Sequence, residues 1–141
     1  MSTEQRPTEA GLGPEFCRTP RRLILFAHGS ADPRWRQPFD ELADELKAQL
    51  GEDAVRLAYL ELTPPTLMDV AGEAVRDHRK RLLVLPFFLA TGAHCSEDLP
   101  AQVAEALLRF PQLEIEVAAP IGEDPRVRQL LRSIACEYGS A

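Results

Sequence analysis

An unbroken apolar stretch, residues 23–27, ends abruptly in the triplet His28-Gly29-Ser30. Because no polar residue alternates within it, the stretch is typical of a strand that is buried on both faces of a parallel sheet. Gly29 lets the chain turn and brings its backbone close to whatever His28 faces. A histidine at the carboxyl end of a first strand stands where open α/β sheets bind ligands. His28 is therefore a candidate site residue, and the alternative is a histidine that satisfies only a local backbone group.

The rest of the chain repeats the order strand, then helix. Apolar runs predict strands at about 22–27, 55–60, 82–86 and 115–118. Amphipathic periodicity predicts helices from about 37 or 38 to 50, 65 to 78, 99 or 100 to 110, and 126 to 138, with Asp98 as an N-cap. Right-handed crossovers then predict an α/β fold of three layers, a four-stranded parallel sheet with helices on both faces, and for it we expect the flavodoxin-like strand order 2-1-3-4. Residues 1–20 lack periodicity and predict a flexible N-terminal arm before a single domain, residues 21–141.

The composition of the chain argues against several classes of protein. A length of 141 residues with 45% apolar content suits one domain with a real core, and a net charge of −6 argues against nucleic-acid binding. No apolar run is long enough to span a membrane, and the N-terminus lacks an apolar signal core, so we expect a cytoplasmic protein. The cysteines Cys17, Cys95 and Cys136 form no C-x-x-C pair, which disfavours a disulfide framework or a cysteine-rich zinc site.

Two histidines are expected to converge on one site. In the sheet order 2-1-3-4, strands one and three are neighbours, so His28 and His94, in the loop after the third strand, share one edge. Glu61 follows the second strand and reaches the same rim. Imidazoles with a carboxylate suit a borderline divalent metal such as Fe, Co, Ni or Zn, and so few ligands leave positions open for handing the metal over. Cys95 is an alternative auxiliary ligand, whereas His78 is predicted to be a solvated surface residue.

The surroundings of these histidines match a flat apolar guest that carries carboxylates at its edge. We expect Phe88 to contact the face of the guest, and Arg34 and Arg36 to pair with its carboxylates. Ser30 is a further expected contact. The alternatives are plain core packing for Phe88 and a solvated loop for the two arginines.

Four segments together resemble the small CbiX/SirB-type class II chelatases. These are residues 25–33 (LFAHGSADP), 58–65 (AYLELTPP), 85–89 (LPFFL) and 92–100 (GAHCSEDLP). Each motif is weak singly, but all four occur in the family's order and with its intervals. The resemblance covers about residue 22 to the C-terminus and implies a chelatase-like domain. Many relatives have Arg where this chain has Ala31, and Val where it has Cys95.

The resemblance implies insertion of a divalent metal into sirohydrochlorin or a related tetrapyrrole. The products belong to sirohaem, cobalamin or nickel-cofactor pathways. Co²⁺, Fe²⁺ or Ni²⁺ is then a substrate, and no organic cofactor is expected. The family's metal-binding histidines map onto His28 and His94, which we expect to act jointly as metal ligands and proton acceptors. Glu61 is a further candidate for charge balance or proton relay.

Other functions compete with this reading. A non-catalytic metal carrier or tetrapyrrole-binding protein could use the same two histidines, since both tasks need open coordination. Histidine phosphatases also open with a strand followed by His-Gly, but they carry Arg immediately before the histidine, where this chain has Ala27.

A homodimer is expected for a steric reason. Burying most of a macrocycle needs an enclosing cavity, and one small α/β domain offers only a shallow rim. A two-fold pair would close over the ring, with both His28/His94 sites facing a common cleft and Arg34 and Arg36 near its mouth. The alternative is a monomer that binds the ring on an open edge.

Overall fold

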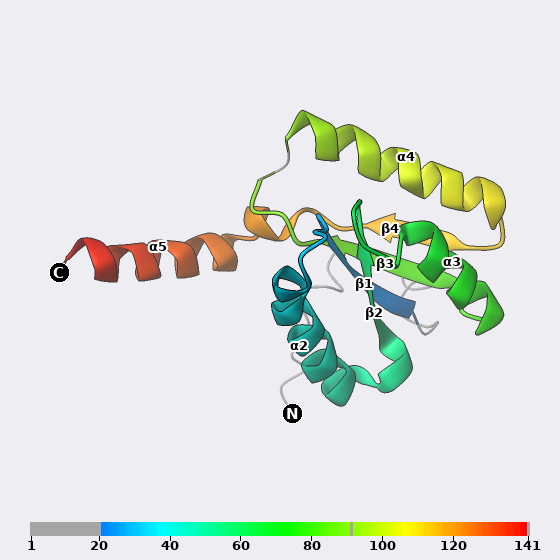
Figure 1. The fold of residues 1–141 in the computed structure, drawn as a ribbon, viewed down its shortest axis with the longest axis horizontal. Helices are drawn as coiled ribbons and strands as arrows, with labels where there is room; N and C mark the ends of the chain where they lie inside the picture. The colour runs from blue at the N-terminus through cyan, green and yellow to red at the C-terminus, as the bar shows by residue number, and fades with distance from the viewer. Residues whose placement is uncertain (1–20, 91, 141) are drawn as a thin grey trace, which may run out of the picture.

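Four parallel strands form one sheet in the order β2-β1-β3-β4 (Figure 1). They are β1 (Arg21–Ala27), β2 (Val55–Tyr59), β3 (Arg81–Pro86) and β4 (Glu114–Val117). The computed structural model describes residues 21–90 and 92–140, and of 93–96 it describes the backbone alone. The predicted strand order and α/β class are confirmed, while the predicted arm, residues 1–20, lies outside the described residues.

Strand β1 is the centre of the sheet. It pairs with β2 through Leu25 and Leu57 and with β3 through Leu25 and Leu85. Residues 24–27 are all buried, which explains why the apolar run shows no alternation.

Helices cover both faces of this sheet. Helix α2 (Pro33–Leu50) lies on one face, over a cluster built on Leu25 and Val55. Helices α3 (Leu67–Arg76) and α4 (Ala93–Arg109) cover the other face, over a core that contains Ile24 and Phe26. A short 3₁₀ turn, η1 (Glu52–Ala54), precedes β2, and a second, η2 (Ile121–Glu123), joins β4 to α5 (Pro125–Gly139). In the part of the chain that the structure describes, no helix combines the length and hydropathy needed to cross a membrane.

Helix α2 begins earlier than predicted. It starts at Pro33 rather than at 37 or 38, because the Asp32 carboxylate accepts a 2.9 Å hydrogen bond from the Arg34 backbone N–H and Pro33 occupies the first turn. Arg34 and Arg36 therefore stand on the first turns of a helix, and the predicted loop is shorter. Helix α3, in contrast, begins two residues later than predicted, where Thr66 forms a capping box with Asp69.

Helix α4 also begins earlier than predicted. It starts at Ala93 with Gly92 as its N-cap, so Asp98 lies inside the helix and is not its cap. The prediction was wrong because Pro100 was taken as a first-turn residue, whereas it stands within the helix and removes one backbone hydrogen bond there. His94 thus belongs to a helical first turn and not to a loop.

Arg22 is a buried cation at the amino end of β1. Its side chain is 0% exposed, and its Nε donates a 2.8 Å hydrogen bond to the Asp53 carbonyl. The guanidinium also lies 3.1 Å from an Asp77 carboxylate oxygen and 3.5 Å from a Glu73 oxygen. These contacts tie β1 to η1 and to the end of α3, so a charge that would be costly alone is compensated.

We predict that Arg22→Ala lowers the free energy of unfolding by about 3 kcal/mol, because it opens a cavity and leaves the Asp53 carbonyl without its donor. Urea unfolding followed by circular dichroism measures the change. Arg34→Ala is the control: Arg34 is 89% exposed, so its loss should alter the unfolding free energy by less than about 0.5 kcal/mol. Equal effects of the two variants would contradict the role of Arg22.

Candidate metal-binding site

His28 projects from the carboxyl end of the central strand. Its side chain is 49% exposed, although the preceding residue, Ala27, is fully buried. The β1–β2 ladder continues past both strands, since the Leu60 N–H donates to the Ala27 carbonyl (2.9 Å) and the Glu61 N–H to the His28 carbonyl (3.2 Å). The backbone therefore holds His28 and Glu61 side by side at the edge of the sheet.

Gly29 makes this close approach possible. It has φ +101°, and a Cβ on it would lie 1.8 Å from the Glu61 carbonyl oxygen. Only glycine meets both conditions. The requirement was visible in the sequence as a glycine directly after the candidate histidine.

His28 and Glu61 form a polar pair that faces solvent. His28 Nε2 lies 3.5 Å from Glu61 Oε1, and both side chains are nearly half exposed. An imidazole nitrogen and a carboxylate oxygen at this spacing can bind one cation together or pass a proton between them. A contact from α4 also fixes the backbone next to Glu61, because the Gln102 amide donates a 3.1 Å hydrogen bond to the Leu60 carbonyl.

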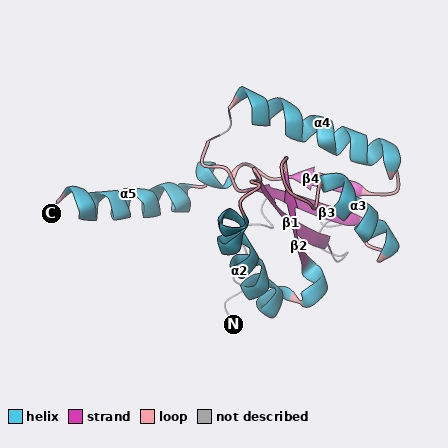
Figure 2. Cartoon of the chain, viewed as in Figure 1, coloured by secondary structure: helices cyan, strands magenta, loops and turns pink. Residues whose placement is uncertain are grey.

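The backbone of His94 lies in the first turn of α4. Because β3 is the parallel neighbour of β1, the chain leaves β3 toward α4 at the same edge of the sheet at which β1 ends (Figure 2). The side chains of His94 and Cys95 fall outside the described ones, so the convergence of His28 and His94 stays a prediction. Among the described residues, no group of three or more His, Cys, Asp or Glu is placed to hold a metal ion.

Phe88 forms an apolar wall beside His28. Its ring meets the His28 ring edge to face at 6.4 Å between centroids, and the Phe26 ring at 6.1 Å. Phe88 is thus part of the core and part of the site at once.

A small polar hollow of about 200 Å³ lies next to the His28 loop. It is lined by Ser30, Ala31, Pro33, Arg36, Asp40 and Thr63. The Ser30 hydroxyl accepts a 3.1 Å hydrogen bond from the Asp32 N–H, which fixes the loop. Arg36 lies 5.8 Å from the centre of the Tyr59 ring and 3.7 Å from Asp40. A cation and a hydroxyl in one hollow suit a carboxylate, and that Ser30 and Arg36 bind one stays a prediction.

Arg34 is not among the residues that line this hollow. Its guanidinium lies 2.9 Å from an Asp32 oxygen, and this hydrogen bonding lowers the pKa of Asp32 and raises that of Arg34. Contact between Arg34 and a substrate therefore stays a prediction.

Sequence reasoning missed three residues near the site: Tyr59, Asp40 and Thr63. Burial raises the pKa of Tyr59, which lies under Arg36. The Arg36–Asp40 pair could have been found from its i,i+4 spacing on α2. Thr63 gave no signal, because its position depends on how the chain turns after β2.

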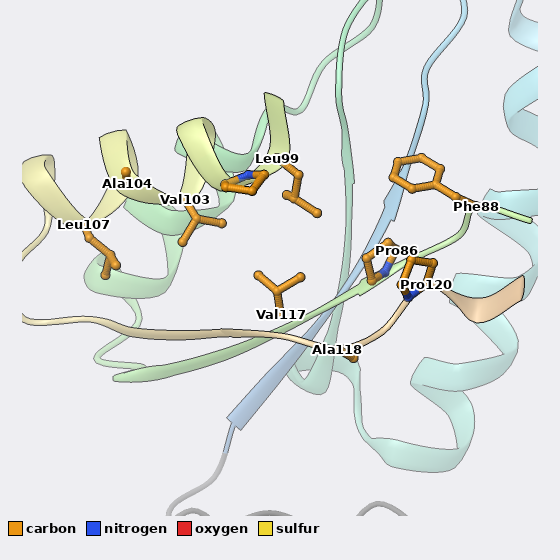
Figure 3. Close-up of a pocket in the computed structure, with 10 residues that line it drawn as sticks. Pro86, Phe88, Leu99, Val103, Ala104, Leu107, Val117, Ala118 and Pro120 are labelled. Atoms are coloured by element: carbon orange, nitrogen blue, oxygen red, sulfur yellow. The ribbon is translucent and has the colours of Figure 1, made fainter. Parts of the chain in front are cut away.

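An apolar groove of about 430 Å³ is lined in part by Phe88 (Figure 3). Leu99, Val103 and Leu107 of α4 line one wall, and Val117, Ala118 and Pro120 line the other. Every residue that lines the groove is apolar. The sequence pattern did not predict this groove.

We predict that Gly29→Ala lowers the free energy of unfolding by about 2 kcal/mol or more, because alanine is strained at φ +101° and its Cβ would collide with the Glu61 carbonyl. Thermal or urea unfolding measures the loss. Gly139→Ala is the matched control, since a Cβ there meets nothing within 4 Å. An unchanged stability of Gly29→Ala would show that the close approach to Glu61 does not exist.

The known proteins that this chain resembles are CbiX proteins and sirohydrochlorin chelatases. The CbiX family model matches residues 22–138. The chloroplastic sirohydrochlorin ferrochelatase of Arabidopsis thaliana is 31% identical over 100 residues, which make up 71% of this chain and 44% of that protein. The sirohydrochlorin cobaltochelatase of Sulfolobus acidocaldarius is 29% identical over 113 residues, or 80% of this chain and 88% of that protein.

A solved structure shows the same fold. The crystal structure of a putative cobalamin (vitamin B12) biosynthesis CbiX protein from Marinobacter aquaeolei VT8 matches with a TM-score of 0.75 and 32% identity, covering 86% of this chain and 97% of that one. The chain spans only 40% to 44% of the length of the curated ferrochelatases that it matches.

Proposed function

The chain belongs to the CbiX family, and we propose that it inserts a divalent metal ion into sirohydrochlorin or a related tetrapyrrole. The observation that carries the proposal is the half-exposed His28 at the carboxyl end of β1, with Glu61 within 3.5 Å and Phe88 against its ring. The names of the relatives, a ferrochelatase and a cobaltochelatase, support the same reaction.

The reaction needs a base and a weak metal site in one place. A divalent ion replaces the two inner N–H protons of the ring, so two protons leave and no electron is transferred. Neutral imidazole can bind the incoming ion or accept one proton, and Glu61 can accept a proton or balance the charge of the ion. We assign His28 and His94 jointly to metal binding and proton acceptance, and Glu61 to relay.

The surroundings of His28 suit the organic substrate. Phe88 offers an apolar surface for the macrocycle, and the hollow with Ser30 and Arg36 offers a site for one of its carboxylates. We place Arg34 at the mouth, where its exposure lets it meet a second carboxylate.

We further propose Co²⁺, Fe²⁺ or Ni²⁺ as the metal substrate, since imidazole accepts all three. The chemistry as written requires no organic cofactor. We also propose that the protein is cytoplasmic. We further propose that it acts as a homodimer, because a macrocycle needs a protein wall on each of its two faces and one sheet edge supplies only one wall.

We predict that His28→Ala and His94→Ala each reduce metal insertion by a factor of about 10² to 10⁴. Both residues are expected to face solvent and not the core, so the unfolding free energy should change by less than about 1 kcal/mol. An anaerobic absorbance assay with sirohydrochlorin and each metal in turn measures the rate at matched concentrations of folded protein.

His78→Asn is the control for these variants. His78 is exposed just after α3 and has φ 57°, a conformation that asparagine tolerates, so both rate and stability should be unchanged. Turnover at the unsubstituted rate in His94→Ala would refute its role. Binding of the ring and metal without product in the unsubstituted protein would favour a carrier instead.

A further inference from the structure

Helix α5 runs away from the sheet and the other helices (Figure 1). None of residues 125–139, all of which the structure describes, is buried. The helix nevertheless carries an apolar stripe at helical spacing: Val127, Leu131, Ile134 and Tyr138, flanked by Leu130. Tyr138 is 82% exposed and Leu130 60%. A stripe of this kind needs a partner surface to bury it.

The segment from which α5 departs is packed against the chain that follows β3. In η2 the Gly122 N–H donates a 2.9 Å hydrogen bond to the Phe88 carbonyl, and a Cβ on Gly122 would lie 2.0 Å from the Leu89 carbonyl oxygen. The Asp124 carboxylate then caps α5 by accepting from the Arg126 N–H at 2.8 Å, and Arg126 lowers the pKa of Asp124 to about 2. The Gly122 contacts therefore hold η2 against the residues that follow β3, at the point from which α5 departs.

The groove between α4 and β4 is a second apolar surface, and it is open to solvent (Figure 3). Val117 in the wall opposite α4 is 41% exposed, although β4 is a strand of the sheet. An open apolar groove beside a helix is the usual receptor for an amphipathic helix. The groove and the stripe are thus complementary in chemistry, but α5 runs away from the groove of its own chain (Figure 1).

We propose that α5 of a second copy of this chain docks in the α4/β4 groove, and that the two copies exchange their helices reciprocally. A contact in which each copy gives and receives the same element closes under two-fold symmetry. The 15-residue helix is about 22 Å long, enough to lie along α4, which has 17 residues. The net charges of the two helices are also complementary. Helix α5 is basic, with Arg126, Arg128 and Arg132 and one acidic residue, Glu137. Helix α4 is acidic, with Glu97, Asp98 and Glu105 and one basic residue, Arg109.

The exchange would bring the second copy to the metal site. Phe88 lines the groove and also contacts the His28 ring. A helix seated in the groove therefore packs against the wall of the site and supports it. This inference rests on the proposed homodimer and names the element that forms it.

Sedimentation velocity at micromolar protein tests the exchange. The unsubstituted chain should be a dimer, and Leu131→Asp, which puts a charge in the stripe, should be a monomer with unchanged circular dichroism, since Leu131 is exposed. Gln129→Asp is the matched control: it introduces the same charge on the opposite face of α5, so it should stay a dimer. A dimer that persists in Leu131→Asp, or an unsubstituted monomer, would overturn the exchange.

Mixing separates exchange from other contacts. Val103→Asp charges the groove and should also be a monomer, but mixed with Leu131→Asp it should form a heterodimer. One intact α5 then meets one intact groove. No heterodimer from two folded variants would overturn the proposal. Because sedimentation is read without turnover, a chain that exchanges helices yet inserts no metal refutes the proposed function alone, and a dimer indifferent to Leu131→Asp refutes the exchange alone.

Discussion

Burial of β1 on both faces is the constraint on which the rest of the structure depends. With β2 and β3 on either side and helices above and below, residues 24–27 are shut off from water, and the first polar side chain that can reach solvent is His28. The ladder then continues through the His28 carbonyl to Glu61, and only a glycine at position 29 tolerates that approach. The site is thus a consequence of where the central strand stops.

The parts that the sequence predicted well are those set by local pattern. Uniform apolar runs marked the strands, and the alternation of strand and helix predicted a parallel sheet. The expected flavodoxin-like order 2-1-3-4 placed His28 and Glu61 at neighbouring strand ends. Phe88 was expected to contact the guest; it lies against the His28 ring, and its contact with a guest stays a prediction. These outcomes follow from hydropathy and chain handedness, which act over short distances.

The features of the structure that could not be predicted from the sequence depend on contacts between distant residues. Prolines marked helix starts, yet Pro33 begins a helix that was placed four or five residues later, and Pro100 stands inside one. An arginine such as Arg22 is typical of a protein surface, and its burial depends on contacts with Asp53 of η1 and Asp77 after α3, which are distant in the sequence. Helix α5 was predicted to exist, but its periodicity carries no information on which chain buries its stripe.

The central claim is that His28 and His94 bind one metal ion at the end of β1. Anomalous diffraction from crystals soaked in Co²⁺ under anaerobic conditions tests it most directly. We predict one peak within about 2.2 Å of a ring nitrogen of His28 and of His94, with open positions toward solvent. A peak bound to one histidine alone, or two separate peaks, would contradict it.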